Sequence, residues 1–214
     1  MTHRHALASI LAIALVSVAV RPATTRAADL SEPKAAAMAF ATAMMTNDGP
    51  GMHAAGIGND EQWKVTETLA KLVVSQQKLS EAATAKFGAE AKMPVNNQLK
   101  NVEDKLKDAD VAINGDEATI TAKNPQPGSE PVKLKKEGGN WKVVLETMTG
   151  KLRGAGAGDP ERLGKLADAM SELADDISAG KFATVAEMRQ ALMTRMAPLM
   201  QPARATSAPA APAK

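Results

Sequence analysis

The chain has 214 residues and a mass of 22.3 kDa, which is room for one ordinary domain. Apolar residues make up 44% of it and charged residues 23%, so it can bury a core. Cysteine is absent, which excludes disulfides, thiol nucleophiles and cysteine-ligated metal centres. Tyrosine is absent as well. Two of the three histidines lie in the first five residues. Because reactive side chains are so few, we expect a protein that is not an enzyme and that holds no cofactor or metal.

The first 27 residues have the three-part pattern of a secretory signal peptide. A basic start is followed by fifteen uncharged, mostly apolar residues from Ala6 to Val20. Thr25 and Ala27 place small residues at positions −3 and −1 of a cleavage site after Ala27. Fifteen apolar residues fall short of the roughly 20 that span a bilayer. The pattern therefore predicts a cleaved leader, a secreted or periplasmic location, and no integral membrane segment after cleavage.

The leader also carries most of the apparent basic character. It holds three of the 26 Lys and Arg residues and none of the 24 Asp and Glu residues, so its removal changes the formal net charge from +2 to −1. Nucleic-acid binding depends on clustered positive charge. We therefore expect no nucleic-acid partner.

Two helices are predicted at the start of the mature chain. The first spans residues 31–47, with Ser31 as its N-cap. The second runs from Asn59 or Asp60, either of which can cap it, to Lys86. Gly88 stands where a left-handed C-terminal residue is expected. Apolar residues three or four positions apart form the stripe of the second helix: Val65, Leu69, Leu72, Leu79 and Ala83.

The apolar period changes to two over residues 102–145. Asn114-Gly115 and Gly138-Gly139 separate alternating runs, and such pairs are strong hairpin signals. The runs predict an antiparallel meander with one apolar and one polar face, packed on the two helices. The fold class is therefore α+β.

The C-terminal third is predicted to be helical. Asp159-Pro160-Glu161 is a helix start, and two amphipathic helices are expected over residues 160–177 and 184–197, with Thr184 and Glu187 as a capping box. The predicted organisation is a leader at 1–27, an α+β domain at 28–150, a Gly-rich linker at 151–159, a helical hairpin at 160–200, and a disordered Pro/Ala-rich tail at 201–214.

The order of helix, long helix and meander, together with the closing strand Glu137 to Leu145 (EGGNWKVVL), resembles small secreted domains of the nuclear transport factor 2-like superfamily. The Ala-rich first helix, Ala35 to Phe40, is also similar to theirs. The resemblance covers residues 31–146 and implies a curved sheet wrapped around the helices, with a pocket at the wide end of a cone. Some members are enzymes of the ketosteroid-isomerase or polyketide-cyclase type. No residue here matches their catalytic base.

Two regions are candidate binding sites. A cone-shaped fold would place Phe40, Leu69 and Trp141 around an apolar ligand cavity. Met193, Met196 and Met200 lie at helical spacing in the last helix, with Met188 nearby. Of these, Met188, Met193 and Met196 are predicted to form a pliable partner-binding face. Exported copper proteins also use methionine sulfur as a ligand, but methionines at this spacing are more often core residues.

Other chemistry-bearing residues have plain structural interpretations. His53, the histidine outside the leader, could act as a general base, but it lies in a Gly-rich stretch that is read as a loop. Gly154 to Gly158 precedes a helix without the Lys-Ser/Thr pair of a phosphate site. The remaining candidates are Glu172, Asp175 and Asp176 as a solvated acidic face, Trp63 as a core anchor, and Lys133, Lys135, Lys136 and Lys142 as a polar sheet face.

These features predict an exported, non-enzymatic binding module of the cell envelope, with a small molecule or an envelope protein as its partner. Two alternatives remain. One is a structural protein that self-associates through its C-terminal helices. The other is a small enzyme of the ketosteroid-isomerase type, which would need a buried carboxylate in its cavity.

Overall fold

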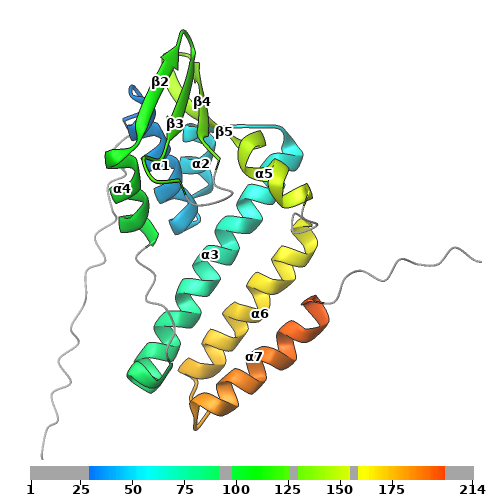
Figure 1. The fold of residues 1–214 in the computed structure, drawn as a ribbon. Helices are drawn as coiled ribbons and strands as arrows, with labels where there is room; N and C mark the ends of the chain where they lie inside the picture. Colours follow the sequence, from blue (N-terminus) through cyan, green and yellow to red (C-terminus); the bar gives the residue numbers. More distant parts are fainter. Residues whose placement is uncertain (1–28, 92–97, 126–129, 155–158, 201–214) are drawn as a thin grey trace, which may run out of the picture.

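The computed structural model describes residues 29–91, 98–125, 130–154 and 159–200; the predicted leader and tail lie outside these ranges. Within them the chain is an α+β protein, as predicted. Figure 1 shows a small twisted sheet surrounded by short helices at one end of the molecule and three long helices side by side at the other.

Helix α1 (Pro33–Thr46) confirms the first predicted helix but begins differently. Its N-cap is Glu32, whose side chain makes no capping bond, rather than Ser31. The Ser31 N–H and O–H both donate to Asp29 instead. At the other end Asn47 adopts the left-handed conformation, and its backbone N–H closes the last turn.

Helix α2 (Gly49–Ala55) occupies the stretch that the sequence indicated as a Gly-rich loop, so that prediction was wrong. Asp48 caps it by accepting from the Gly51 N–H at 3.1 Å, and a proline lies in its first turn. A Cβ on Gly51 would lie 2.3 Å from an Asp48 carboxylate oxygen. A larger residue at this position would therefore have to displace the capping carboxylate.

Helix α3 (Asp60–Phe87) confirms the long helix; its 28 residues correspond to about 42 Å. Its start is a capping box, in which the Gln62 N–H donates to the Asn59 side chain and the Asn59 N–H donates to the Gln62 side chain, each at 2.9 Å. Gly88 ends it with a positive φ of 59°, although its ψ of −141° lies outside the left-handed helical region. A short 3₁₀ turn, η1 (Gly88–Ala91), follows.

Helix α4 (Gln98–Asp108) is a second element that the sequence analysis missed. The period-two region was predicted to begin at residue 102, but the first strand of the meander begins at Asp110. Val102 and Leu106 are four positions apart, which is a helical spacing, and Leu106 packs against the sheet core. With apolar residues so sparse, the pattern here did not separate a helix from a strand.

The sheet is a meander extended by one parallel strand. Gly115 has a φ of 60° and closes the first hairpin, and Gly138 and Gly139, at 58° and 86°, close the second. The parallel strand was not predicted because it is two residues long. A Cβ on its Gly56 would lie 2.8 Å from Phe40. The strands are β1 (Gly56–Ile57), β2 (Asp110–Asn114), β3 (Glu117–Thr121), β4 (Val132–Glu137) and β5 (Asn140–Val144), in the spatial order β1-β5-β4-β3-β2.

Helix α5 (Leu145–Gly154) follows β5 directly. The sequence predicted Leu145 as the end of the strand and a linker from residue 151, and both expectations are corrected, because the chain turns helical at Leu145 and stays so to Gly154. Leu145 is buried in the sheet core, so its apolar character fits a helix start as well as a strand end. Residues 155–158, the rest of the expected linker, lie outside the described ranges.

Helices α6 (Pro160–Ser178) and α7 (Val185–Met200) form the predicted helical hairpin. Asp159 caps α6 by accepting from the Glu161 N–H at 3.0 Å. The capping box of α7 is only half as predicted. Thr184 accepts from the Glu187 N–H, but the Glu187 carboxylate accepts from the N–H of residue 183 rather than from that of Thr184. The helix also continues through Pro198, where an end was expected.

Two cores hold these elements together. The first lies between the sheet and helices α1, α2 and α4, with α1 packed across β3, β4 and β5. We call this region, with α5, the sheet end. Its largest members include Phe40, Met52, Ile120, Leu134, Trp141, Val143 and Leu145.

The second core lies between the C-terminal half of α3 and helices α6 and α7, which we call the helical end. Helix α6 packs along α3 and has α7 on its other side (Figure 1). Helix α3 therefore contributes to both cores: Ala70 belongs to the first, and Leu79 and Ala83 belong to the second. The other buried members of the second core are Ala91, Leu173, Ala174, Ile177 and Met188.

Candidate functional site

The three residues predicted to line an apolar cavity do not share one environment. Phe40 and Trp141 are each 3% exposed and lie in the same packed core at the sheet end. Leu69 is half-buried on α3 and belongs to neither core cluster. The structure thus places two of the three in one packed core. The two pockets described below are lined by other residues.

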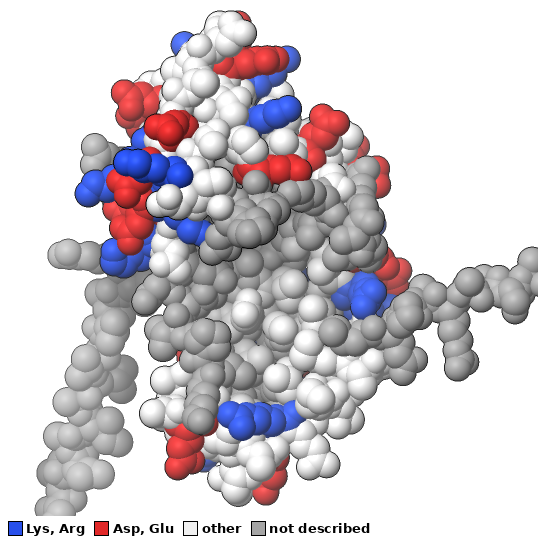
Figure 2. Space-filling view, in the orientation of Figure 1, with Lys and Arg blue, Asp and Glu red and all other residues white. Residues whose placement is uncertain are grey.

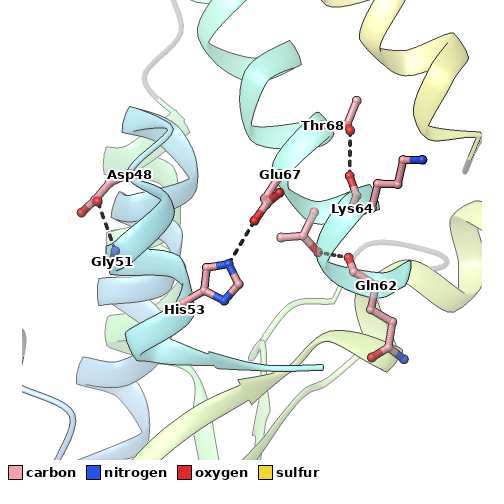
Figure 3. Close-up of polar contacts among 8 residues, drawn as sticks. Asp48, Gly51, His53, Gln62, Lys64, Glu67 and Thr68 are labelled. Atoms are coloured by element: carbon pink, nitrogen blue, oxygen red, sulfur yellow. Dashed lines mark hydrogen bonds and ion pairs between the residues drawn. The ribbon is translucent and has the colours of Figure 1, made fainter. Parts of the chain in front are cut away.

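His53 lies on α2 and reaches across to α3 (Figure 3). Its ring stacks on Trp63, with the ring centroids 3.9 Å apart and the planes inclined by 28°. Its Nε2 lies 3.0 Å from an Oε1 of Glu67, one turn further along α3. Both side chains of this pair are about half exposed. The helical position of His53, which the sequence analysis missed, is what points the ring at α3.

This arrangement can orient an imidazole. If Nε2–H donates to Glu67, the neutral ring presents Nδ1 as an acceptor, as in a general base held by a carboxylate. No group of three or more potential metal ligands occurs among the described residues. Asp48, the nearest acid in sequence, is directed at Gly51 (Figure 3). The His53–Glu67 contact therefore links α2 to α3.

The methionines predicted as a partner-binding face point in different directions on α7. Met188 is fully buried in the helical-end core, which makes it a core residue. Met193 is 73% exposed, and Met196 is half-buried. One of the three thus faces solvent, and the side chain of Met200 lies outside the described residues.

A pocket of about 460 Å³ lies between α7 and the turn that leads into it, and we call it the α7 pocket. It is a shallow depression that combines an aromatic ring with charged and amide side chains. Its lining residues are Lys181, Phe182, Glu187, Gln190, Ala191, Thr194 and Arg195.

The polar wall of the α7 pocket is organised by Asp176, near the end of α6. The Arg195 Nη2 donates to one Asp176 oxygen at 2.5 Å, and the Lys181 Nζ lies 2.6 Å from the other. These two bonds, that from Lys181 first, hold the pKa of the Asp176 carboxyl below its usual value. The other guanidinium nitrogen, Arg195 Nη1, is buried and has no hydrogen-bond partner among the described residues. Two cations thus share one carboxylate, and one donor is left unsatisfied.

Sequence reasoning grouped Asp176 with Glu172 and Asp175 as a solvated acidic face. The structure separates them. Asp175 pairs with Lys78 of α3 at 2.7 Å and Glu172 is exposed, whereas the Asp176 side chain is only 18% exposed. Arg195 is 19 positions from Asp176, so no local spacing rule could have shown that they pair.

The lysine-rich face of the sheet is balanced by acidic residues. Lys142 lies 2.7 Å from Glu137. Lys136 was predicted on this face, but it lies opposite Trp141 in the β4–β5 ladder and therefore on the other, core-facing side of the sheet, with its Nζ 5.6 Å from the centroid of the Trp141 ring. Figure 2 shows Lys and Arg interspersed with Asp and Glu over the sheet end. A second pocket of about 460 Å³ opens here between β4, β5 and α5, lined by Glu130, Lys133, Val144, Glu146, Thr147 and Gly150.

No family model, curated protein or solved structure matches this chain. The resemblance to nuclear transport factor 2-like domains therefore stays a prediction. Within the described ranges no helix is both long and apolar enough to cross a membrane. What the structure defines is an α+β protein with a sheet end, a helical end and a polar pocket beside its last helix.

Proposed function

We propose that the mature chain is an exported, non-enzymatic binding module of the cell envelope, and that its docking site is the α7 pocket. The leader pattern of residues 1–27 supports export. The observation that carries the binding site is that the α7 pocket brings two cations, Lys181 and Arg195, together with the Phe182 ring in one depression.

The lining of the α7 pocket indicates the chemistry of the ligand. Arg195 and Lys181 are already paired with Asp176, but as multiple N–H donors they can also donate to an oxygen acceptor on a ligand. Phe182 and Ala191 offer apolar contact, while Gln190 offers amide hydrogen bonds. The ligand is therefore a group that joins an oxygen acceptor to an apolar part, either on a small molecule or on a segment of an envelope protein.

Native mass spectrometry of protein exported by its own host is the first test. A reproducible adduct on the wild type that is lost in Arg195→Gln supports the proposal. Lys165→Gln is the matched control, because it removes an exposed cation of α6 that does not line the pocket. An adduct that survives Arg195→Gln would place the site elsewhere, and a bare wild-type protein would contradict a tightly held ligand. The same spectrum reports whether residues 1–27 are removed.

Self-association through the C-terminal helices is the second candidate function. Met193, which is 73% exposed on α7, favours it. A discrete oligomer without an adduct, dissociated by Met193→Lys, would replace the binding proposal with this one.

The ketosteroid-isomerase alternative requires a buried carboxylate. The buried polar side chains among the described residues are those of Thr66, Ser75 and Thr149, and none of them is an acid. No observation therefore favours this alternative.

A further inference from the structure

Strand β2 leaves one side of the sheet open. It stands last in the strand order, and no described strand pairs with its outer edge. Its Ile113 is 59% exposed, although its partner across the ladder, Ala118, is buried. Natural edge strands are usually protected by lysine, proline or a bulge. β2 has none of these, and Asp110 is its single charged residue.

The hairpin geometry determines which backbone groups face this edge. The two-residue turn at Gly115-Asp116 closes on the pair Asn114 and Glu117, and in such hairpins the closing pair exchanges both backbone hydrogen bonds. Antiparallel pairs alternate between bonded and non-bonded. Ala112 is therefore also bonded to β3, whereas the N–H and C=O groups of Val111 and Ile113 point to the open edge.

We propose that β2 pairs antiparallel with β2 of a second copy of this chain, about a two-fold axis at Ala112. In this register Val111 of one copy lies opposite Ile113 of the other, and both residues carry edge-facing groups. The two pairs exchange four backbone hydrogen bonds. The sheets of the two copies then form one continuous sheet.

The side chains of β2 are self-complementary in the same register. Val111 already packs against the sheet-end core, and its partner would be the exposed Ile113 of the other copy on the same face. Asp110 lies opposite Asn114, so no like charges meet. Ala112 lies opposite the Ala112 of the second copy, and its side chain is small enough to leave the two-fold axis unobstructed.

A second copy fits this edge better than an unrelated peptide, because all five residues of β2 find a compatible partner in β2 itself. The other edge of the sheet is the two-residue β1, which offers little to pair with. Two-fold pairing at one edge consumes that edge in both copies, so the assembly closes as a dimer rather than growing into a fibre.

The absence of cysteine allows a direct test by crosslinking. In the proposed register the two Ala112 residues form a non-bonded pair with Cα atoms about 4.5 Å apart, which lies within the range of a disulfide. We expect Ala112→Cys to form a covalent dimer under mild oxidation. Met193→Cys, at an exposed position of α7, is the matched control. Crosslinking of Ala112→Cys no faster than that of the control would overturn the proposal.

Sedimentation of the untagged protein gives an independent readout. We expect twice the monomer mass for the wild type and for Ile113→Val, and the monomer mass for Ile113→Lys with an unchanged circular dichroism spectrum. Ile113 is mostly exposed in the single copy, so lysine there is compatible with the fold. A wild type that remains monomeric at every concentration would overturn the proposal, as would a dimer that is dissociated by Met193→Lys and not by Ile113→Lys. Neither result bears on ligand binding in the α7 pocket, which is tested separately.

Discussion

The two ends of the molecule are built from different elements and leave different surfaces exposed. At the sheet end, aromatic residues from distant parts of the chain, Phe40 and Trp141, meet in one core. At the helical end the buried core consists of Ala, Leu, Ile and Met side chains, with Phe87 and Phe182 packed at its margin, and ion pairs at 2.7 Å join α3 to α6, as between Lys71 and Asp168. Exposed ion pairs of this kind contribute little, so apolar packing dominates at both ends. What differs is the surface left over: an open strand edge at one end and a polar pocket at the other.

Helix α3 makes the two ends mechanically dependent. Its N-terminal half carries Trp63 and Ala70 toward the sheet, and its C-terminal half carries Leu79 toward α6 and α7. The backbone hydrogen bonds of α3 run without a break from the half that packs in one core to the half that packs in the other. Loss of either core should therefore destabilise the whole helix. We therefore expect the two ends to unfold together. Two changes test this expectation and two smaller ones test single contacts, one at each end; they are given from the largest expected effect to the smallest.

Removing the main aromatic residue of the sheet-end core has the largest expected effect. Trp141→Ala should lower the free energy of unfolding by about 3–5 kcal/mol, since it empties a packed site. Denaturant unfolding followed by circular dichroism measures the loss. Hydrogen exchange should show protection falling at both ends. Loss of protection at the sheet end alone would show that the two cores are independent. Leu173→Ala provides the matching change at the helical end.

Breaking α3 at its middle tests the connection directly. Gln76 is exposed there, so its replacement removes no core contact. Gln76→Pro deletes a backbone hydrogen bond and should cost about 3 kcal/mol, whereas Gln76→Ala should be nearly neutral. A single denaturation transition at lower denaturant is expected. Two separated transitions in Gln76→Pro would mean that each end folds without the other.

The capping box of α3 should contribute less. Asn59→Ala removes the acceptor for the Gln62 N–H and should cost about 1 kcal/mol in thermal unfolding. Asn59→Asp keeps an acceptor and should stay close to the wild type. If both variants lose the same stability, the cap is not the cause.

The smallest effect is expected at Asp176, and it should depend on pH. Its folded pKa lies below the ordinary value of 3.8 because Lys181 and Arg195 bond to the charged form. The folded state therefore favours the ionised carboxylate. The resulting stability is fully present above the unfolded pKa and is lost as the pH falls through the folded pKa. Unfolding measured from pH 6 downward should show this extra acid sensitivity in the wild type and not in Asp176→Asn. Identical pH profiles would contradict the pairing.

The sequence predicted a helix most accurately where its cap residues and its apolar stripe both lay within or next to the helix itself. The cap and apolar stripe of α3 predicted it almost to the residue, as Asp159 and Pro160 did for α6. The prediction failed where the signals conflicted. The glycines around His53 concealed α2, and the sparse apolar residues of α4 resembled a strand. The predicted cavity mixed core and surface positions because apolar character alone does not reveal which side chains meet.

The amino-acid sequence by itself determined the α+β class, the order of the main elements and both hairpin turns, because these depend on caps, turn glycines and the period of apolar residues over a few positions. Only the tertiary structure decided that His53 stacks on Trp63, that Arg195 reaches Asp176, and that α3 joins two cores. Those contacts join residues that are ten or more positions apart in the chain, so they follow from how whole elements pack and not from any local pattern.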